Sequence, residues 1–502
     1  MKLIPSFAVL FASRAVVALT GFLLIPLYLQ HLGVAALGVI TLFLSIQACL
    51  LVFDLGLSTS ASTRAANLAL DASDHQMGAL LKLSEDMYWL IGLLACMGLW
   101  LLSTLLLPKW LWSAVENSSP TGWASVTNLL ACLSLLLTWP QNYYAAVLSG
   151  SYRQKILAYI VVVSALMKLL IVYMILKYAP NLLMLYSALC AVALVQTAWM
   201  RYASRLLYKQ VAARLTWNDM KQSIKHSLDR NLLLIAAIGT ILAQGDKVYL
   251  SMLLPVTEYA AYAVAAMLCG SLYMLINPLY TMLLPYFMAV LSKKDDQLLR
   301  GRYQQASQIA AILVVPAGLL LVFFCNVGLE LWLDDPKMIE TASPVLYWLA
   351  VGTTAHGLLY VPYSLQIATG WTSLALRMNL ALLAMLLPLL YVGSHLWGAA
   401  GAAACWAVIN LTFLLIWPAL MHRRLIVGYA LRWNAKFVFL PVIITCIVMY
   451  LFRFILFGSV QSMVVLAAGA LAAYLASFLC VAIAMPYSRS KLFQYFKNSP
   501  AA

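Results

Sequence analysis

The stretch Leu3–Leu29, LIPSFAVLFASRAVVALTGFLLIPLYL, is long and apolar, and its one charged residue, Arg14, lies about midway along it. A helix needs about 20 apolar residues to cross a bilayer. The stretch is too long for a signal peptide and no small-residue cleavage site precedes the next apolar segment, so we expect a retained first membrane helix. A charge near the centre of such a helix costs about 2.5 to 3.5 kcal/mol, so Arg14 is expected to face a protein interior or a hydrated cavity.

The composition of the whole chain agrees with this stretch. Of 502 residues, 64% are hydrophobic and only 9% are charged, and the mean hydropathy is +0.92. These values predict an all-α polytopic membrane protein. The net charge of +15 would suggest nucleic acid in a soluble protein. Here the basic residues cluster in short loops, where they set membrane topology, and we expect no nucleic-acid partner.

About 14 segments meet the length requirement for a membrane span. They are 6–29, 37–61, 87–107, 124–148, 156–176, 182–200, 232–254, 260–290, 304–327, 343–368, 374–394, 398–420, 437–457 and 462–485. With the amino terminus inside, the outer loops hold only Lys109, Lys177 and Lys337, and most of the 31 lysines and arginines lie in the inner segments. Inner loops accumulate basic residues, so both termini are predicted to be cytoplasmic.

The longest polar connection, 201–230, divides the chain into lobes. Its leucines and Val211 at helical spacing among basic residues predict an amphipathic helix at the cytoplasmic lipid surface, although an ordinary basic connector fits equally well. The predicted organisation is an N-terminal six-helix lobe 1–200, the linker 201–230, a C-terminal six-helix lobe 231–422, two additional helices 423–486 and a basic cytoplasmic tail 487–502. A faint echo between Ile25–Leu37 and Lys247–Tyr259 favours a parallel repeat of the two pseudo-symmetric lobes.

Basic residues within the predicted spans indicate an anionic cargo. Arg14 offers several donors to a diphosphate or sugar acid and stays charged. Lys168 is central in 156–176 and can bind phosphate as a point charge, although an interhelical ion pair is an equal alternative. Lys247 faces a cavity or packs its long stem on the protein. We therefore take Arg14, Lys168 and Lys247 as candidate substrate-binding residues.

Other charges near the spans have gating, coupling or lipid-facing interpretations. Asp246 and Lys247 are neighbours on one helix, about 100° apart, so they are predicted not to point the same way. Asp246 is expected to pair with a basic residue of another helix, as a structural or coupling carboxylate. Asp54 and Arg64 lie near the inner end of the second span and form either a gate or a clamp between helices. Arg453 is expected to reach lipid headgroups, with a lipid-groove role as the alternative.

Nothing in the pattern of reactive side chains predicts an enzyme. The nine cysteines and six histidines are scattered, and no HExxH-type ligand pair exists. We therefore expect no metal, no cofactor and no catalytic residue. The acidic outer stretch Gly328–Ala342 is interpreted as a solvated loop.

Three motifs resemble a known family. They are LGVAALGV (Leu32, Gly33 and Gly38) followed by DLGL from Asp54 and then Arg64; QGDKVY (Gln244–Tyr249) followed by Tyr259 and Tyr262; and GAAGAAA (Gly398–Ala404) with Asn410. In order and spacing they resemble the polysaccharide flippases of the multidrug/oligosaccharidyl-lipid/polysaccharide exporter superfamily, including Wzx-type O-antigen flippases. The likeness covers most of the first twelve spans.

The resemblance implies two six-helix bundles around a central cavity that opens alternately to either side of the membrane. The implied function is a flippase of the bacterial inner membrane that moves undecaprenyl diphosphate-linked oligosaccharide, such as a lipopolysaccharide O-antigen unit, to the periplasm. Its implied partners are this lipid-linked oligosaccharide, membrane lipids, and a polymerase and chain-length regulator of glycan assembly. Fourteen spans also resemble the lipid II flippases. The alternatives are a cation-coupled multidrug exporter of the same superfamily and a membrane glycan polymerase or glycosyltransferase.

Overall fold

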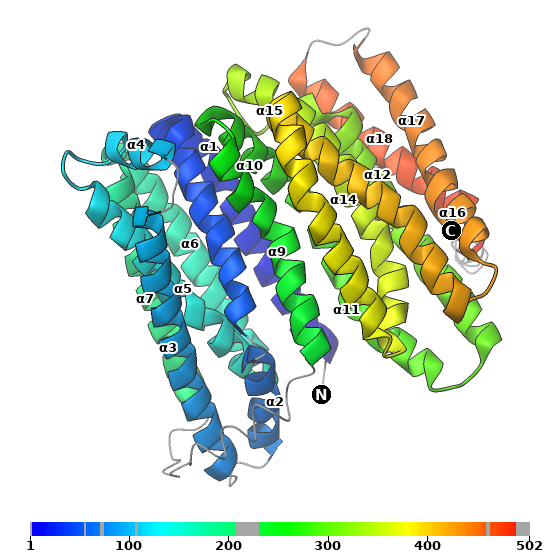
Figure 1. The fold of residues 1–502 in the computed structure, drawn as a ribbon, viewed down its shortest axis with the longest axis horizontal. Helices are drawn as coiled ribbons and strands as arrows, with labels where there is room; N and C mark the ends of the chain where they lie inside the picture. Colours follow the sequence, from blue (N-terminus) through cyan, green and yellow to red (C-terminus); the bar gives the residue numbers. More distant parts are fainter. Residues whose placement is uncertain are drawn as a thin grey trace, which may run out of the picture. The chain divides into compact units, whose positions relative to one another are not determined.

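The computed structural model describes residues 3–54, 57–70, 75–105, 109–206, 230–457 and 462–487, and every regular element among them is helical (Figure 1). The predicted all-α polytopic fold is therefore confirmed. The chain forms two compact units, unit 1 (Met1–Ala260) and unit 2 (Ala261–Ala502). The amphipathic linker predicted within 201–230 falls almost wholly outside the described residues, as does nearly all of the tail 487–502.

Unit 1 is a bundle in which α5 is a central packing partner. Its helices are α1 (Leu3–Leu50), α2 (Leu57–Leu70), α3 (His75–Leu105), α4 (Lys109–Asn117), α5 (Ala124–Gly150), α6 (Gln154–Tyr178), α7 (Leu182–Arg205) and α9 (Arg230–Leu253), with a 3-10 turn η1 (Leu51–Asp54). Helices α2, α3 and α7 all pack against α5, and α6 and α9 pack against α1. Figure 1 shows α5, α6 and α7 side by side. Helix α10 (Val256–Gly270) begins in unit 1 and continues into unit 2.

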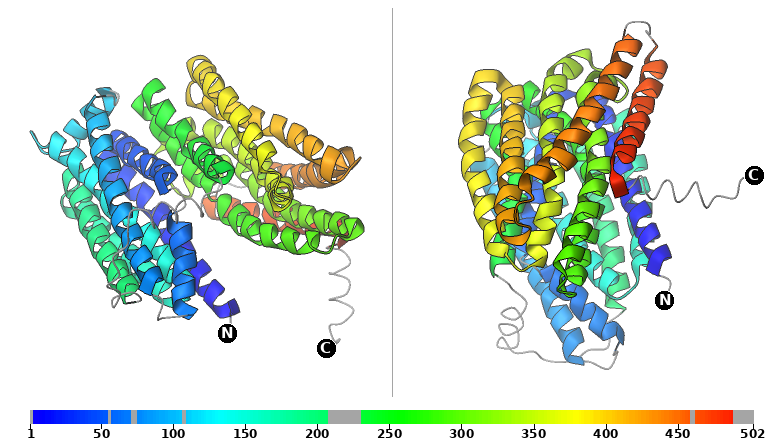
Figure 2. Two further views of the ribbon diagram at one scale, coloured as in Figure 1. Left: turned by 60° about the horizontal axis from the view of Figure 1, so that its bottom comes forward. Right: turned by 90° about the vertical axis from the view of Figure 1, so that its right-hand side faces the viewer.

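Unit 2 is built around α14 and α12. After α10, its helices are α11 (Tyr273–Leu291), α12 (Asp296–Phe323), α13 (Cys325–Glu330), α14 (Pro336–Ala368), α15 (Thr372–Leu425), α16 (Ala430–Asn434), a π-helical turn η2 (Ala435–Phe439), α17 (Leu440–Phe457) and α18 (Met463–Ala484). Helix α14 packs against α11, α12 and α15. The last two helices, α17 and α18, pack against each other and against α12, and Figure 2 shows them as orange and red neighbours.

Eight helices in the described part of the chain are long and apolar enough to span a membrane. Two of them are broken by glycines that sit in the sequence motifs. Gly33 (φ 81°) interrupts α1, and Gly398 (φ 58°), next to Trp397, interrupts α15. Glycine adopts this left-handed backbone region without steric cost, which explains a sharp turn at both points. Helix α1 therefore covers the predicted span 6–29 and part of 37–61, and α15 covers both 374–394 and 398–420.

Two predicted span boundaries are wrong. The segment 37–61 is not one helix, because α1 ends at Leu50 and the chain passes through η1 before α2 begins at Leu57. The segment 260–290 is likewise divided into α10 and α11 by a turn at Ser271–Leu272. At each break one polar residue, Asp54 or Ser271, lies in a stretch that is otherwise mostly apolar, so mean hydropathy gives no signal of the break.

The boundary between the compact units also differs from the predicted linker. It lies after α9 rather than within 201–230, because α9 packs against α1 of unit 1. The two repeat lobes stay a prediction. Locally, both segments of the faint echo cross a helix break: Ile25–Leu37 contains the kink at Gly33, and Lys247–Tyr259 contains the turn between α9 and α10.

Candidate functional site

Among the described residues of unit 1, Arg14 and Lys168 are the two basic span residues without an acidic partner. Arg14 lies on α1 with an exposed side chain, and Lys168 is half-buried near the middle of α6. Helices α1 and α6 pack against each other. Neither side chain makes a hydrogen bond or ion pair with the described residues. Both charges are therefore available to a ligand, and the ion pair considered for Lys168 is not found among those residues.

Lys247 does not share this availability, and its predicted relation to Asp246 is wrong. The Lys247 ammonium lies 3.2 Å from Asp246 Oδ1, with the two side chains 16% and 12% exposed. It also donates to the carbonyl oxygen of Ala243 at 3.0 Å. The two Cα–Cβ bonds diverge, but the flexible lysine stem folds back along α9 and brings the charges together. Asp246 thus forms an ion pair with a neighbour on its own helix, which we did not expect.

Asp54 and Arg64 make separate contacts. Asp54 follows the break at the end of α1 and accepts hydrogen bonds from the hydroxyl (2.8 Å) and the backbone N–H (3.3 Å) of Ser58 on α2. Arg64 on α2 donates to the Ser84 hydroxyl on α3 at 2.8 Å. Asp54 therefore fixes the start of α2, and Arg64 links α2 to α3. These contacts agree with a clamp between helices, and the gating role stays a prediction.

Arg453 of α17 belongs to unit 2. Its side chain is exposed and donates to the carbonyl oxygen of Phe323, the last residue of α12, at 3.2 Å. A cation at the carboxyl end of a helix offsets the partial negative charge of the unpaired carbonyls. Arg453 therefore joins one of the two additional helices to the end of α12, a contact that sequence analysis did not anticipate.

A buried carboxylate in unit 1, which sequence analysis missed, joins three helices. Glu85 on α3 is fully buried, and its carboxylate accepts from Arg201 Nε at 2.8 Å and from Arg205 Nη2 at 3.1 Å, both on α7. The Tyr144 hydroxyl of α5 donates to the same carboxylate at 2.8 Å. Trp89 in turn donates its indole N–H to the Tyr144 oxygen at 3.0 Å. We call these five residues the Glu85 network.

The Glu85 network had a sequence signal that was overlooked. Arg201 and Arg205 are four residues apart and so lie on one face of a helix. Arg201 and Arg205 serve in the sequence analysis only to assign membrane topology, and Glu85 lies just before the predicted span 87–107. The two arginines are 41% exposed, so the network lies at an edge of the bundle and one side of it reaches solvent.

The span charges therefore divide into two classes. Asp246 compensates Lys247, Phe323 O accepts from Arg453, and Glu85 compensates its two arginines. Arg14 and Lys168 have no such compensation among the described residues. No group of three or more His, Cys, Asp or Glu side chains in the described segments is placed to hold a metal ion. The uncompensated cations Arg14 and Lys168 can attract an anion.

The sequence matches no protein-family model and no curated protein. Solved structures do resemble the fold. The lipid II flippase MurJ in an inward closed conformation gives a TM-score of 0.67 at 10% identity, covering 97% of this chain and 100% of its own.

Two other solved transporters resemble a smaller share of the chain. The Vibrio cholerae MATE transporter VcmN in its bent form gives a TM-score of 0.56 at 17% identity, covering 86% of this chain and 96% of its own. A Pyrococcus furiosus transporter of the MOP superfamily, described as having a binding pocket of reverse polarity, gives a TM-score of 0.58 at 13% identity, covering 84% of this chain and 94% of its own. The chain thus has the fold of these membrane transporters.

Proposed function

We propose that this chain is a flippase for an undecaprenyl diphosphate-linked oligosaccharide, such as an O-antigen repeat unit. It would act in the bacterial inner membrane and move the headgroup from the cytoplasmic to the periplasmic leaflet by alternating access. The lipid tail would stay in the bilayer, and cationic side chains would neutralise the diphosphate or acidic sugars. No catalytic residue is assigned, and a glycan polymerase with its chain-length regulator would act on the product.

The observation that carries this proposal is the uncompensated pair Arg14 and Lys168. A basic side chain in a membrane span is costly, so a protein that keeps one without an acidic partner must gain from it elsewhere. An anionic headgroup would supply the missing charge during transport. Lys247 contributes less to this role because Asp246 already neutralises it. We propose the Asp246–Lys247 pair and the Asp54 and Arg64 contacts as coupling or gating elements.

The extent of the structural likeness supports a lipid-linked cargo. The lipid II flippase matches 97% of this chain, whereas the two other transporters match 84% and 86%. The match to the lipid II flippase therefore extends to the two additional helices α17 and α18. Those helices pack against α12 through a cluster that contains Met449, Leu466 and Ala473.

A cation-coupled multidrug exporter is the second candidate, because MATE transporters have the same fold. Export of cationic drugs requires carboxylates that are free to bind a cation. In the described residues, both Asp246 and the buried Glu85 are already paired with basic side chains. The charge balance therefore favours an anionic cargo.

Surface glycan tests the proposal in a strain that lacks the native gene. Arg14→Ala and Lys168→Ala should each abolish surface glycan while the protein reaches the membrane at normal levels. Lys177→Ala is the matched control, because Lys177 is on the same helix as Lys168 but in its last turn, where it lies over the Tyr178 ring. Normal glycan in both test variants would remove these residues from the transport pathway.

A further inference from the structure

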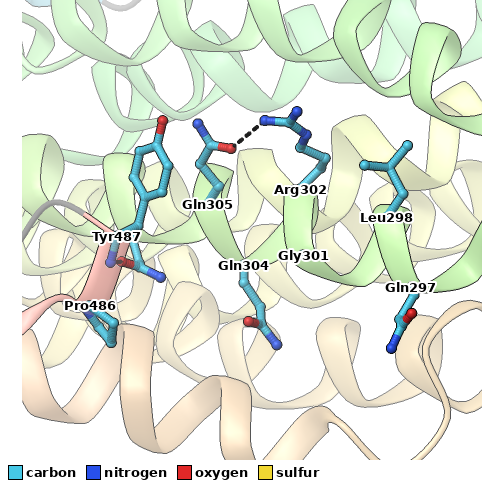
Figure 3. Close-up of a pocket in the computed structure, with 9 residues that line it drawn as sticks. Gln297, Leu298, Gly301, Arg302, Gln304, Gln305, Pro486 and Tyr487 are labelled. Atoms are coloured by element: carbon cyan, nitrogen blue, oxygen red, sulfur yellow. Dashed lines mark hydrogen bonds between the residues drawn. The ribbon is translucent and has the colours of Figure 1, made fainter. Parts of the chain in front are cut away.

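A pocket of about 490 Å³ in unit 2 lies outside the charges discussed so far (Figure 3). It is formed by the first turns of α12 and by Pro486 and Tyr487, which follow α18. Its polar lining consists of Gln297, Arg302, Gln304, Gln305, Gln308 and Tyr487. The volume falls within the range of about 300 to 1,000 Å³ that is usual for small-molecule sites. We call it the glutamine pocket.

Internal hydrogen bonds fix the walls of the glutamine pocket. Gln308 is buried, and its Oε1 accepts from the backbone N–H of Tyr487 at 3.0 Å, which ties the segment after α18 to α12. Arg302 Nη1 donates to Gln305 Oε1 at 3.0 Å. Figure 3 shows Arg302, Gln305 and Tyr487 on the same side of α12. These two bonds orient Arg302, Gln305 and Gln308, while Gln297 and Arg302 remain exposed.

Gly301 leaves the pocket open. A side chain built at this glycine would meet no atom within 4 Å. The residue is helical, so no backbone requirement explains the glycine, and an alanine would favour the helix by about 1 kcal/mol. Gly301 and its sequence neighbour Arg302 both line this pocket.

The lining chemistry suits a hydroxyl-rich group that carries one phosphate. Each glutamine amide supplies two donors and an acceptor oxygen, which is the combination that sugar hydroxyls need. Arg302 uses one of its five N–H donors in the hydrogen bond to Gln305, and a guanidinium binds phosphate oxygens well. Leu298, Pro486 and the Tyr487 ring add apolar surface beside these polar groups.

We propose that the glutamine pocket binds a sugar phosphate, either free in solution or as the headgroup of a lipid. This goes beyond the proposed function, which assigns no role to these residues of unit 2. Binding to the pocket can be measured at equilibrium, without transport. The pocket lies at the end of α12 that follows the basic residues Lys293 and Lys294, which the charge pattern assigns to the cytoplasmic side.

The test uses the full-length protein in phosphatidylcholine nanodiscs, with glucose 1-phosphate as the probe in isothermal titration calorimetry. Wild type should bind the probe saturably, and at least tenfold more tightly than glucose or inorganic phosphate alone. Gly301→Leu, which fills the pocket, and Arg302→Gln should each weaken binding at least tenfold. Absence of saturable binding in wild type, or unchanged binding in Gly301→Leu, would overturn the proposal.

Two controls separate the pocket from general effects on α12. Gly301→Ala adds only one methyl group and should keep binding within about threefold. Arg300→Gln removes a charge two residues from Arg302 on the same helix, but Arg300 does not line the pocket and donates instead to the Val427 carbonyl oxygen. It should bind like wild type, and a loss equal to that of Arg302→Gln would show that only net charge matters and would contradict the proposal.

Competition identifies the source of the ligand. Nanodiscs that contain a polyprenyl phosphate-linked glucose should displace glucose 1-phosphate if the pocket takes a lipid headgroup, and should not if it takes the free compound. Either result supports the site. Equal displacement by phosphatidylglycerol would show a general preference for anionic lipid and would overturn the assignment to a sugar.

Discussion

Removal of the Glu85 side chain should weaken the contacts among three helices. Its carboxylate joins α3 to α7 through Arg201 and Arg205, and to α5 through Tyr144. A hydrogen bond to a charged group contributes more than one between neutral groups, and a buried partner left unpaired costs about 1 to 3 kcal/mol. The arginines can turn to solvent, which lowers the cost, but the buried tyrosine hydroxyl cannot do so as readily.

We therefore predict that Glu85→Ala destabilises unit 1 by about 1 to 3 kcal/mol. The measurement is the thermal denaturation midpoint of the protein in detergent, which should fall clearly. Asp86→Ala is the control, because Asp86 is the next residue and is exposed. If both variants melt together with wild type, the Glu85 network does not stabilise the bundle.

Single residues also show where sequence reasoning reaches its limit. Chemical type and helical position placed Arg14 and Lys168 in spans, and this needed no structure. The same reasoning failed for Lys247, because helical pitch fixes the direction of the Cα–Cβ bond but not the path of a long side chain. It also missed Glu85, because its arginine partners are more than a hundred positions away in the chain.

Helix α15 is the element whose packing depends most visibly on small residues. After the break at Gly398, the chain folds back so that Gly401 lies against the backbone of Gly393, and a Cβ at either glycine would overlap its neighbour. Such close backbone contact is typical of membrane helices. The GAAGAAA motif therefore has a packing function in addition to its family likeness.

Gly401→Val should accordingly disrupt this contact. Forcing extra carbons into a packed interior costs about 1 to 3 kcal/mol, and here the obstacle is backbone rather than a flexible side chain. The expected result is a lower thermal midpoint and reduced protein in the membrane. Ala400→Val, at a half-exposed neighbouring position, should change neither. Equal behaviour of the two variants would refute the close contact at Gly401.

At the scale of elements, composition predicts membrane helices well and their interruptions poorly. A helix in lipid must satisfy its own backbone groups, so a long apolar stretch leaves few other structures. The breaks at Leu51–Asp54 and at Ser271–Leu272 each contain one polar residue, Asp54 or Ser271, within a stretch that is otherwise mostly apolar, so mean hydropathy does not mark them. The breaks at Gly33 and Gly398 are easier to predict, because each occurs at a glycine. In the structure both glycines have a positive φ.

Over the whole molecule, the distribution of basic residues predicts which ends of the membrane helices are cytoplasmic. Helix α6 tests it well, because its 25 residues extend about 37 Å and Arg153 and Lys177 mark its two ends. The first is predicted to be cytoplasmic and the second periplasmic.

In a variant without the nine native cysteines, Lys177→Cys should react with a membrane-impermeant maleimide in intact spheroplasts. Arg153→Cys should react only after the membrane is permeabilised. The reverse pattern would invert the topology and place the glutamine pocket on the other side of the membrane.

The central claim is that an uncompensated span cation receives an anionic lipid-linked headgroup. It is tested most directly by reconstituting the purified protein in liposomes with a fluorescent undecaprenyl diphosphate-linked oligosaccharide and measuring how fast the headgroup becomes accessible on the opposite leaflet. We predict rapid movement with wild type and with Lys177→Ala, and movement at the rate of protein-free liposomes with Lys168→Ala. Movement by Lys168→Ala at the wild-type rate would contradict the account.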